Sequence, residues 1–389
     1  MKKWIPILVM VSLLILVFAV GVRGDELAGS VTGDSVRQVE QYNFSIHILA
    51  MLLVGFGFLM VFVKKYGYSA TTGTFLVVGV GLPLYLLLRS LGFLSAEAIP
   101  ADNIKALLLA EFATASALIA MGALLGRLRL YQYAIVGALA VIAYTLNEWL
   151  VLDGGLGITK GFTDAAGSIV IHAFGAYFGL GMALALSNKS HADEAIESDE
   201  TSDRFSMLGS MVLWIFWPSF CSAVVPPEQM PQTAINTIMA LCGATLITYI
   251  TSSILRKGKP AIGDIANAAL AGGVAIGATC NLVSTAGAFG IGLLAGALCV
   301  IGYVVIQPKL QAGLKFIDTC GVHNLHGMPG LLGGIIAIFV VPGVAVAQIS
   351  GIVTTILLAL ICGVIGGWII KATGNKQMLY EDREDFVSL

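Results

Sequence analysis

Long apolar stretches, separated by short polar connections, repeat along almost the whole chain. A helix that spans a membrane needs about 20 predominantly apolar residues, and most of these stretches reach that length. Twelve segments fit: 4–22, 43–63, 72–91, 106–126, 131–152, 165–187, 206–225, 233–255, 264–284, 286–306, 319–341 and 346–370. The pattern predicts an all-α polytopic membrane protein with eleven core transmembrane helices after the first segment.

The first apolar segment has two interpretations. Lys2 and Lys3 precede it, and small residues near 21–24 offer a cleavage site, as in a secretory signal peptide. The apolar run is long for a signal peptide, so residues 1–24 are expected to form either a cleaved signal or an additional transmembrane helix.

Basic residues are distributed unevenly between the two sides of the predicted membrane. With the amino terminus in the cytoplasm, the inner segments hold sixteen Lys and Arg residues and the outer segments hold five. Because cytoplasmic loops carry an excess of Lys and Arg, this bias places the carboxyl tail, 372–389, in the cytoplasm. We expect a multi-pass protein of the cell (inner) membrane, with the lipid bilayer as its surroundings.

The longest polar connection, 188–204, divides the membrane domain, 25–371, into two halves. The halves, about 43–187 and 206–341, contain five predicted spans each. Since five is odd, the second half runs opposite to the first, which indicates a five-plus-five inverted repeat. Such repeats place a transport site at their interface, near the middle of the membrane.

Composition supports a membrane protein and excludes some partners. Hydrophobic residues make up 57% of the chain and charged residues 11%, against about 25% charged in a soluble domain. No block of basic residues indicates a nucleic-acid partner. The six cysteines lie in apolar stretches without a C-x-x-C pattern, so neither a disulfide framework nor a metal site is expected.

One motif occurs in the last predicted span of each half. It reads D-x-x-G-x-x-x-x-H, from Asp164 to His172 and from Asp318 to His326. The spacing is a little over two helical turns, roughly 12 Å of rise, so each Asp lies near a helix start and each His near mid-membrane. An Asp at a helix amino terminus accepts free N–H groups there. We expect the two acids to fix the helix ends and the two histidines to face the lumen.

Paired imidazoles suit a small polar substrate. A neutral imidazole offers one donor and one acceptor, so two of them can share a hydrogen bond and still present polar atoms to a molecule such as ammonia. A bare metal cation would lose several kcal/mol of hydration with little compensation. Histidine also exchanges protons near neutral pH, so the pair is a candidate relay if ammonium loses a proton on the way in.

Other histidines have plainer interpretations. His47 either has a function or packs by bonding a neighbouring group. His323 lies three residues before His326, so it either lines the cavity or packs on the same helical face. His323 and His326, together with His172, could in principle bind zinc. A catalytic zinc site also needs a general base, and none is evident beyond the helix-end acids. We therefore predict neither an enzyme nor a cofactor.

Several stretches resemble the Rh (Rhesus) glycoproteins, a branch of the ammonium transporter family. They are VGFGFLMVFVKKYGYSA at 54–70, LNEWL at 146–150, SIVIHAFGAYFGL at 168–180, LWIFWPSF at 213–220, ANAALAGGVAIG at 266–277 and DTCGVHNLHGMPGLLGGI at 318–335. The resemblance implies an ammonia or ammonium channel and a homotrimer with one pore in each subunit. It also implies that His172 and His326 are the paired pore histidines.

The resemblance assigns further residues. Phe112, in AEFATAS, and Phe220, in WPSF, match the stacked pore phenylalanines. Glu148 matches an acidic residue of the outer vestibule, where a carboxylate would raise the local ammonium concentration. Trp217 and His323 are expected beside the vestibule as well.

Two positions depart from the family patterns. Cys221 stands where many Rh proteins have Asn. Val224 stands where the high-affinity bacterial transporters have a Ser, which favours passive conduction over ammonium scavenging.

Other functions stay open at this point. An apolar pore would also pass carbon dioxide or methylamine. An ammonium sensor is a further alternative, although the carboxyl tail has fewer than 20 residues and is too short for an attached signalling domain.

Overall fold

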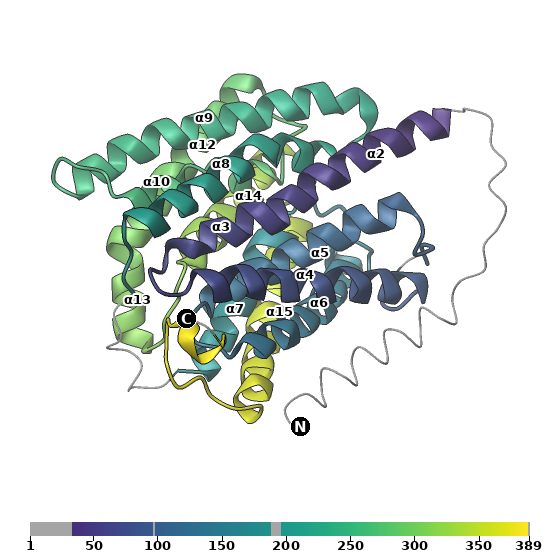
Figure 1. The fold of residues 1–389 in the computed structure, drawn as a ribbon. Helices are drawn as coiled ribbons and strands as arrows, with labels where there is room; N and C mark the ends of the chain where they lie inside the picture. Colours follow the sequence, from purple (N-terminus) through teal and green to yellow (C-terminus); the bar gives the residue numbers. More distant parts are fainter. Residues whose placement is uncertain (1–32, 96–97, 188–195, 388–389) are drawn as a thin grey trace.

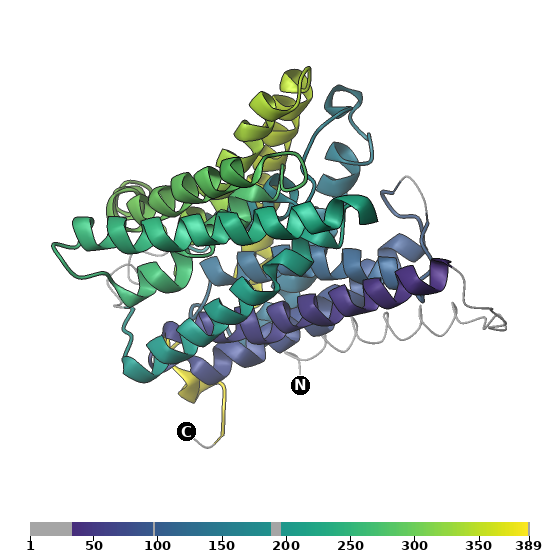
Figure 2. The ribbon, with the colours of Figure 1, turned by 90° about the horizontal axis from the view of Figure 1, so that it is seen from above.

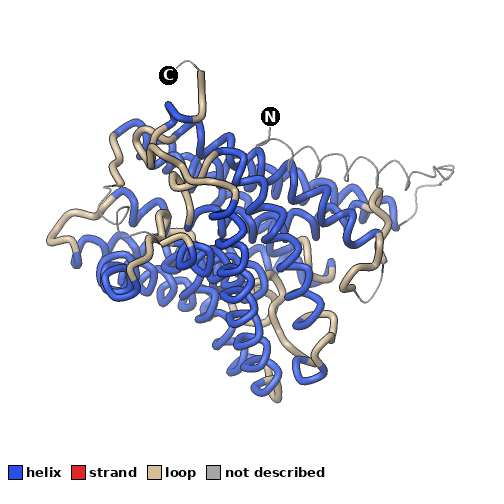
Figure 3. Tube along the Cα trace, turned by 90° about the horizontal axis from the view of Figure 1, so that it is seen from below, coloured by secondary structure: helices blue, strands red, loops and turns tan. Residues whose placement is uncertain are grey.

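The computed structural model describes residues 33–95, 98–187 and 196–387. Every regular element in these ranges is a helix, and Figure 3 shows no strand among them. This confirms the all-α membrane class. The predicted first span, 4–22, lies outside the described residues.

Ten helices in the described ranges are long and apolar enough to cross a membrane. In the first half the spans are Val36–Phe62, which begins in α2 (Gly33–Ala50), α4 (Gly67–Ser90), α5 (Ile104–Ala123), α6 (Leu130–Val151) and Ser168–Ala185, which ends in α7 (Phe174–Ala185). In the second half they are α8 (Glu200–Ser222), Pro227–Leu255 with α9 (Met230–Leu255), Thr285–Leu314 with α12 (Thr285–Ile301) and α13 (Gln307–Leu314), and His323–Val340 with α14 (Met328–Val340). The last span is α15 (Ala345–Ala372).

The predicted span 264–284 is helical over a shorter range, Ile262–Ile276, with an interruption after Ala268. Two short helices occupy it, α10 (Ile262–Ala268) and α11 (Ala271–Ile276), and turns follow. The turn backbone bonds to the other half: the Ala166 amide donates to the Gly277 carbonyl, and the Ala278 amide donates to the Ser168 hydroxyl. Hydropathy alone does not reveal this break, because the partners of these backbone groups are more than 100 residues away.

The two halves pack in matching ways. In the first half α4 packs on α6, and in the second half α9 packs on α12, which occupies the corresponding position in the repeat. Figure 1 shows α8, α9 and α12 in one group and α4, α5 and α6 in another, and Figure 2 shows the same two groups from above. Across the interface α8 contacts the first span, and α14 contacts the segment that holds His172. The interface therefore brings the two D-x-x-G-x-x-x-x-H motifs together.

The carboxyl tail folds back onto the bundle. After α15 it reaches the start of α4, where the carboxylate of Asp382 accepts the amides of Tyr68 at 3.0 Å and Ser69 at 2.8 Å. Lys376 is buried and pairs with Asp385 at 2.5 Å. The tail thus caps a helix more than 300 residues earlier in the chain.

Candidate functional site

The same backbone device precedes each pore histidine. Gly167 and Gly321 both have left-handed backbone angles, with φ of 76° and 68°. A glycine adopts this conformation without the steric cost that a side chain would impose. The chain then enters a short π-helix in both halves, η4 (Ser168–Ala173) and η8 (His323–Gly327). π-turns of this kind occur frequently at functional sites.

The two acids of the motifs hold these helix starts. Asp164 Oδ2 accepts the amides of Ile169 at 2.9 Å and Val170 at 2.8 Å. Asp318 accepts the amides of Val322 at 2.9 Å and His323 at 3.0 Å, one on each oxygen. Each carboxylate therefore satisfies two amides that would otherwise lack partners at a helix start.

The two histidines meet at the interface of the halves. Their Nδ1 atoms are 3.2 Å apart, and the ring planes differ by 13° with centroids 5.3 Å apart. Both side chains are buried. Because one Nδ1 must donate and the other accept, the two rings hold complementary tautomers. Among the residues that the structure describes, none forms a hydrogen bond with the Nε2 atom of His172, so this atom remains able to bond a small polar molecule.

Aromatic rings enclose one side of this pair. Phe112 and Phe220 meet edge to face, with centroids 4.6 Å apart and planes at 71°. The family resemblance implied stacked phenylalanines, and the two rings are adjacent but steeply inclined. Trp217, which we expected beside the vestibule, is buried and stacks on His172 at 5.6 Å.

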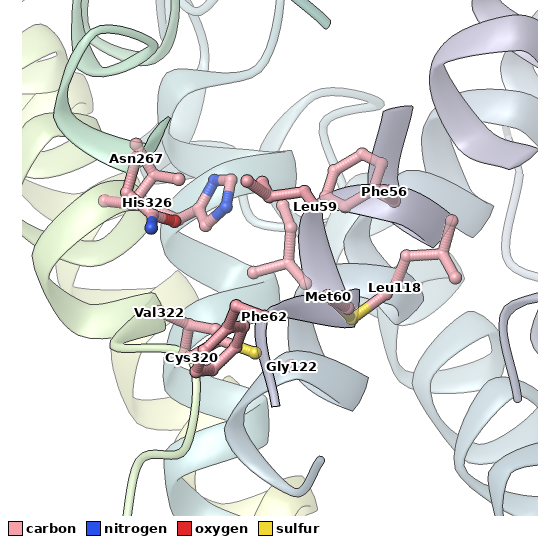
Figure 4. A pocket seen from close by; sticks show the side chains of 12 residues that line it. Phe56, Leu59, Met60, Phe62, Leu118, Gly122, Asn267, Cys320, Val322 and His326 are labelled. Carbon is pink, nitrogen blue, oxygen red and sulfur yellow. The ribbon is translucent and has the colours of Figure 1, made fainter. Parts of the chain in front are cut away.

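Two narrow cavities lie on either side of His326. One is bounded by Phe220, Trp217, both histidines and Ala115, and its volume is about 10 Å³. The other has a volume of about 30 Å³ and is bounded by Phe56, Leu59, Phe62, Gly122 and His326, all of which Figure 4 labels. A single water molecule needs roughly 10–15 Å³, so these spaces fit molecules of the size of water or ammonia one at a time.

Small residues let the backbones around this lumen approach closely. A Cβ atom added to Gly175 would lie 2.5 Å from the Ser116 carbonyl oxygen. One added to Gly330 would lie 2.4 Å from the Ser168 carbonyl oxygen. Substitution at either glycine would therefore push apart helices that position the histidines.

Glu148, on α6, lies in a buried polar cluster that it forms with residues of α4. Tyr85 donates to its carboxylate at 2.7 Å, and Arg89 Nη1 lies 3.7 Å from Glu148 and 3.3 Å from Asp153. The cluster contains two carboxylates and one guanidinium, so it carries one excess negative charge when all three groups are ionised.

The remaining histidines are separate from the pair. His47 Nδ1 lies 2.9 Å from the Ser219 hydroxyl, and its ring stacks on Phe216. His323 lies edge-on to Tyr177, with ring centroids 5.8 Å apart. Among residues 33–95, 98–187 and 196–387, no group of three or more His, Cys, Asp or Glu side chains is arranged to hold a metal ion.

One buried acid of the pore helix was missed by the sequence analysis. Glu111 immediately precedes Phe112, and its Oε1 atom lies 2.5 Å from the hydroxyl of Ser45 on α2. A carboxyl group inside an apolar span is a functional candidate in its own right, so its position in AEFATAS was an available signal.

Comparison with known proteins identifies the family. The family model described as Ammonium Transporter Family matches residues 7–385. The chain belongs to the ammonium transporter family, in its Rh branch. Ammonium transporter Rh type B of Oryctolagus cuniculus is 37% identical over 356 residues, which cover 83% of this chain and 76% of that protein. Ammonium transporter Rh type B-A of Xenopus laevis is 39% identical over 303 residues, and the match spans 76% of this chain but only 64% of that relative.

Solved structures support the same branch. The structure of Nitrosomonas europaea Rh50, described with the conduction mechanism of the Rhesus family of channels, is 63% identical with a TM-score of 0.91. The match covers 92% of this chain and 94% of Rh50. A sensor Amt protein is 19% identical, with a TM-score of 0.78 over 91% of this chain and 98% of its own, which shows a shared fold alone.

Proposed function

We propose that this Rh-family protein conducts ammonia through the lumen that the two histidines line. The observation that carries this proposal is the pair itself: two buried imidazoles, with Nδ1 atoms 3.2 Å apart, in a space that is otherwise mostly apolar. The pair offers hydrogen bonds to a small polar molecule. Two neutral imidazoles carry no negative charge that would compensate a buried cation.

The size and lining of the cavities favour the neutral species. An ammonium ion in a lumen of about 10 Å³ would lose its hydration shell. Replacing that shell requires charged groups or several convergent oxygen atoms, because uncompensated burial of an ion is costly. Neutral ammonia loses far less and can bond an imidazole nitrogen. We therefore infer that ammonium gives one proton to the outer aqueous phase, and that the resulting ammonia passes Phe112 and Phe220.

The proposal assigns roles to the surrounding groups. Asp164 and Asp318 hold the histidine helices in place through their amide bonds. The excess negative charge of the Glu148 cluster attracts ammonium to the outer side. Trp217 fixes one face of His172. His323, beside Tyr177, contributes to the polarity next to the pair.

The proposal also includes a homotrimer in the cell (inner) membrane, with the carboxyl tail in the cytoplasm. The distribution of Lys and Arg supports this orientation. The apolar exposed face formed by Met211, Ile215 and Leu246 is suited to lipid or to another subunit. Native mass spectrometry in a mild detergent would test the trimer, and a monomeric mass would contradict it.

Proteoliposomes with an internal pH dye and a membrane-potential probe test conduction. We expect faster internal alkalinisation after ammonium addition than in protein-free liposomes, without an ammonium-dependent voltage signal. An ammonium-dependent voltage would instead mean that charge crosses. No difference from empty liposomes would contradict the proposal and direct attention to carbon dioxide.

Variants connect the flux to the pair. We expect His172→Ala to slow alkalinisation severalfold, because it removes half of the polar lining. Phe339→Ala is a control for reconstitution, since Phe339 on α14 is 83% exposed. A His172→Ala protein that conducts ammonia normally, with unchanged selectivity, would refute the role of the pair.

A further inference from the structure

We propose that Cys221 and Cys280 together form a binding site for a soft monovalent cation of the Cu(I) class, in the wall of the bundle behind Phe220. The site goes beyond the proposed function and does not take part in ammonia passage. Only its expected effect on flux rests on the proposed function.

The two cysteines come from segments that pack against each other. Cys221 lies in the last turn of α8, and Cys280 lies in the turns that follow α11. One helical turn before Cys221, the Trp217 indole lies against α11, where a Cβ added to Gly273 would be 2.4 Å from Trp217 Cε2. In the predicted topology both segments continue from this contact toward the outer side. The contact therefore brings together two cysteines that are far apart in the chain.

The two thiols are in contact and buried. The Cys280 thiol hydrogen-bonds with the Cys221 thiol, and neither residue has exposed surface. Cys280 Sγ also donates to the Gly277 carbonyl at 3.7 Å, and the Cys280 carbonyl accepts the side-chain amide of Asn236 at 2.8 Å. These bonds hold Cys280 in place from two sides, so its sulfur atom is fixed beside that of Cys221.

This ligand set selects the kind of cation. Sulfur ligands favour soft ions such as Cu(I) over the hard cations that prefer oxygen. A structural zinc site takes four protein ligands. Within residues 33–95, 98–187 and 196–387, no group of three or more His, Cys, Asp or Glu side chains is arranged to hold a metal ion. Cu(I) accepts two ligands in a linear geometry, so the two sulfur atoms are sufficient for it.

A neutral complex suits a buried site, because uncompensated charge is costly there. Cu(I) displaces the proton of the Cys221 thiol, which leaves to the outer aqueous phase, and bonds to the thiolate that remains. Cys280 keeps its proton, which it already donates to the Gly277 carbonyl, and its sulfur atom supplies the second bond. One thiolate and one monovalent cation sum to zero charge, and no atom changes its oxidation state.

The site is close to the molecular surface and to the pore. Val224 and Leu282, three and two residues after the cysteines, are exposed. Phe220 immediately precedes Cys221 and meets Phe112 edge to face, with centroids 4.6 Å apart. A metal bridge would tie the backbone beside Phe220 to the turns after α11. Because a permeating molecule must displace one of the two rings, we expect the loaded protein to conduct ammonia more slowly.

Competition for Cu(I) with a chromogenic chelator, under anaerobic conditions in detergent, measures binding to the purified protein. We expect the wild type to retain one Cu(I) per chain. Cys221→Ser and Cys280→Ser should each bind at least about tenfold more weakly, since one soft ligand remains. Cys299→Ser is the matched control, because Cys299 on α12 is equally buried, and it should bind as the wild type does.

X-ray absorption of the wild-type complex tests the ligands without any variant, and we expect two sulfur neighbours around the copper. Wild-type binding by both single variants, weakened binding by Cys299→Ser, or a copper ion without two sulfur neighbours would overturn the site.

Flux is compared in proteoliposomes between unloaded protein and protein that was loaded with Cu(I) and freed of unbound ion. We expect alkalinisation to slow severalfold in the loaded protein and to stay unchanged in Cys280→Ser given the same treatment. Equal rates for loaded and unloaded wild type would overturn the effect on Phe220. A wild type without any ammonium-dependent signal would refute the proposed function, and the copper competition would still decide the site.

Discussion

Gly273 on α11 sets the position of the indole that stacks on His172. A Cβ atom at this position would lie 2.4 Å from Trp217 Cε2 and 2.7 Å from Trp217 Nε1. Ordinary contacts begin near 3.4 Å, so Gly273→Ala must displace the indole by about 1 Å. The indole also borders the cavity of about 10 Å³ around the histidines, and little free space is available to absorb the shift.

The expected effect is larger on conduction than on folding. Overpacking of this kind costs about 1–3 kcal/mol, and the better helix propensity of Ala returns up to about 1 kcal/mol. The variant is therefore expected to fold. If about 1.4 kcal/mol of the strain adds to the barrier for passage, conduction falls about tenfold.

Stopped-flow alkalinisation of proteoliposomes measures this effect. Gly290→Ala is the matched control, because an added Cβ on Gly290 of α12 meets nothing within 4 Å. Gly273→Ala combined with Trp217→Phe should recover part of the rate, since the smaller ring makes room for the methyl group. Normal conduction by a folded Gly273→Ala protein would refute the argument that the Trp217 position controls the lumen.

Two further predictions concern the carboxyl tail. Asp382→Ala removes the acceptor of two α4 amides and should destabilise the protein by about 1 kcal/mol. Denaturation in detergent measures this loss, with Asp102→Ala as the control at an exposed site. Equal stability of the two variants would exclude a capping role. Burial raises the pKa of Glu384, but hydrogen bonds from the Met378 and Gln377 amides outweigh it, and the net shift is downward. A lowered folded pKa stabilises the tail above the ordinary Glu pKa of about 4.3, and the stabilisation is lost as pH falls through the folded value. Pepsin should therefore cut the wild-type protein within residues 376–385 only at the acid end of the pH range in which pepsin is active. It should cut the Glu384→Gln variant there at pH values near 5 as well. Identical cleavage profiles of the two proteins against pH would contradict this expectation.

Hydropathy and an internal repeat determined much of the fold. Eleven core segments were located from apolar length alone, because a bilayer imposes a span of about 20 residues on any helix that crosses it. Ten of them are long helices in the described part of the structure. The eleventh, 264–284, has the right composition but breaks after Ala268 and ends at Ile276, and the backbone that follows, at Gly277 and Ala278, bonds to Ala166 and Ser168 of the opposite half.

The repeated motif also identified the two histidines and their acids, because matched spacing in two halves of a chain implies matched positions in space. The distance and mutual orientation of the rings were not available from spacing. They depend on how α14 packs against the π-helix at Ser168–Ala173, and hence on close contacts such as Gly330 with the Ser168 carbonyl.

Side-chain surroundings were decided by the tertiary structure alone. The sequence placed Glu148 in an open vestibule and did not single out Glu111, yet both are buried carboxyls with different partners. Arg89 and Tyr85, about 60 residues away along the chain, compensate Glu148. Within the described part of the chain, the one side-chain hydrogen bond to Glu111 comes from the hydroxyl of Ser45, on another span. A sequence shows which residues can carry charge, but the local field around a charge depends on neighbours that only the packing of the helices brings near.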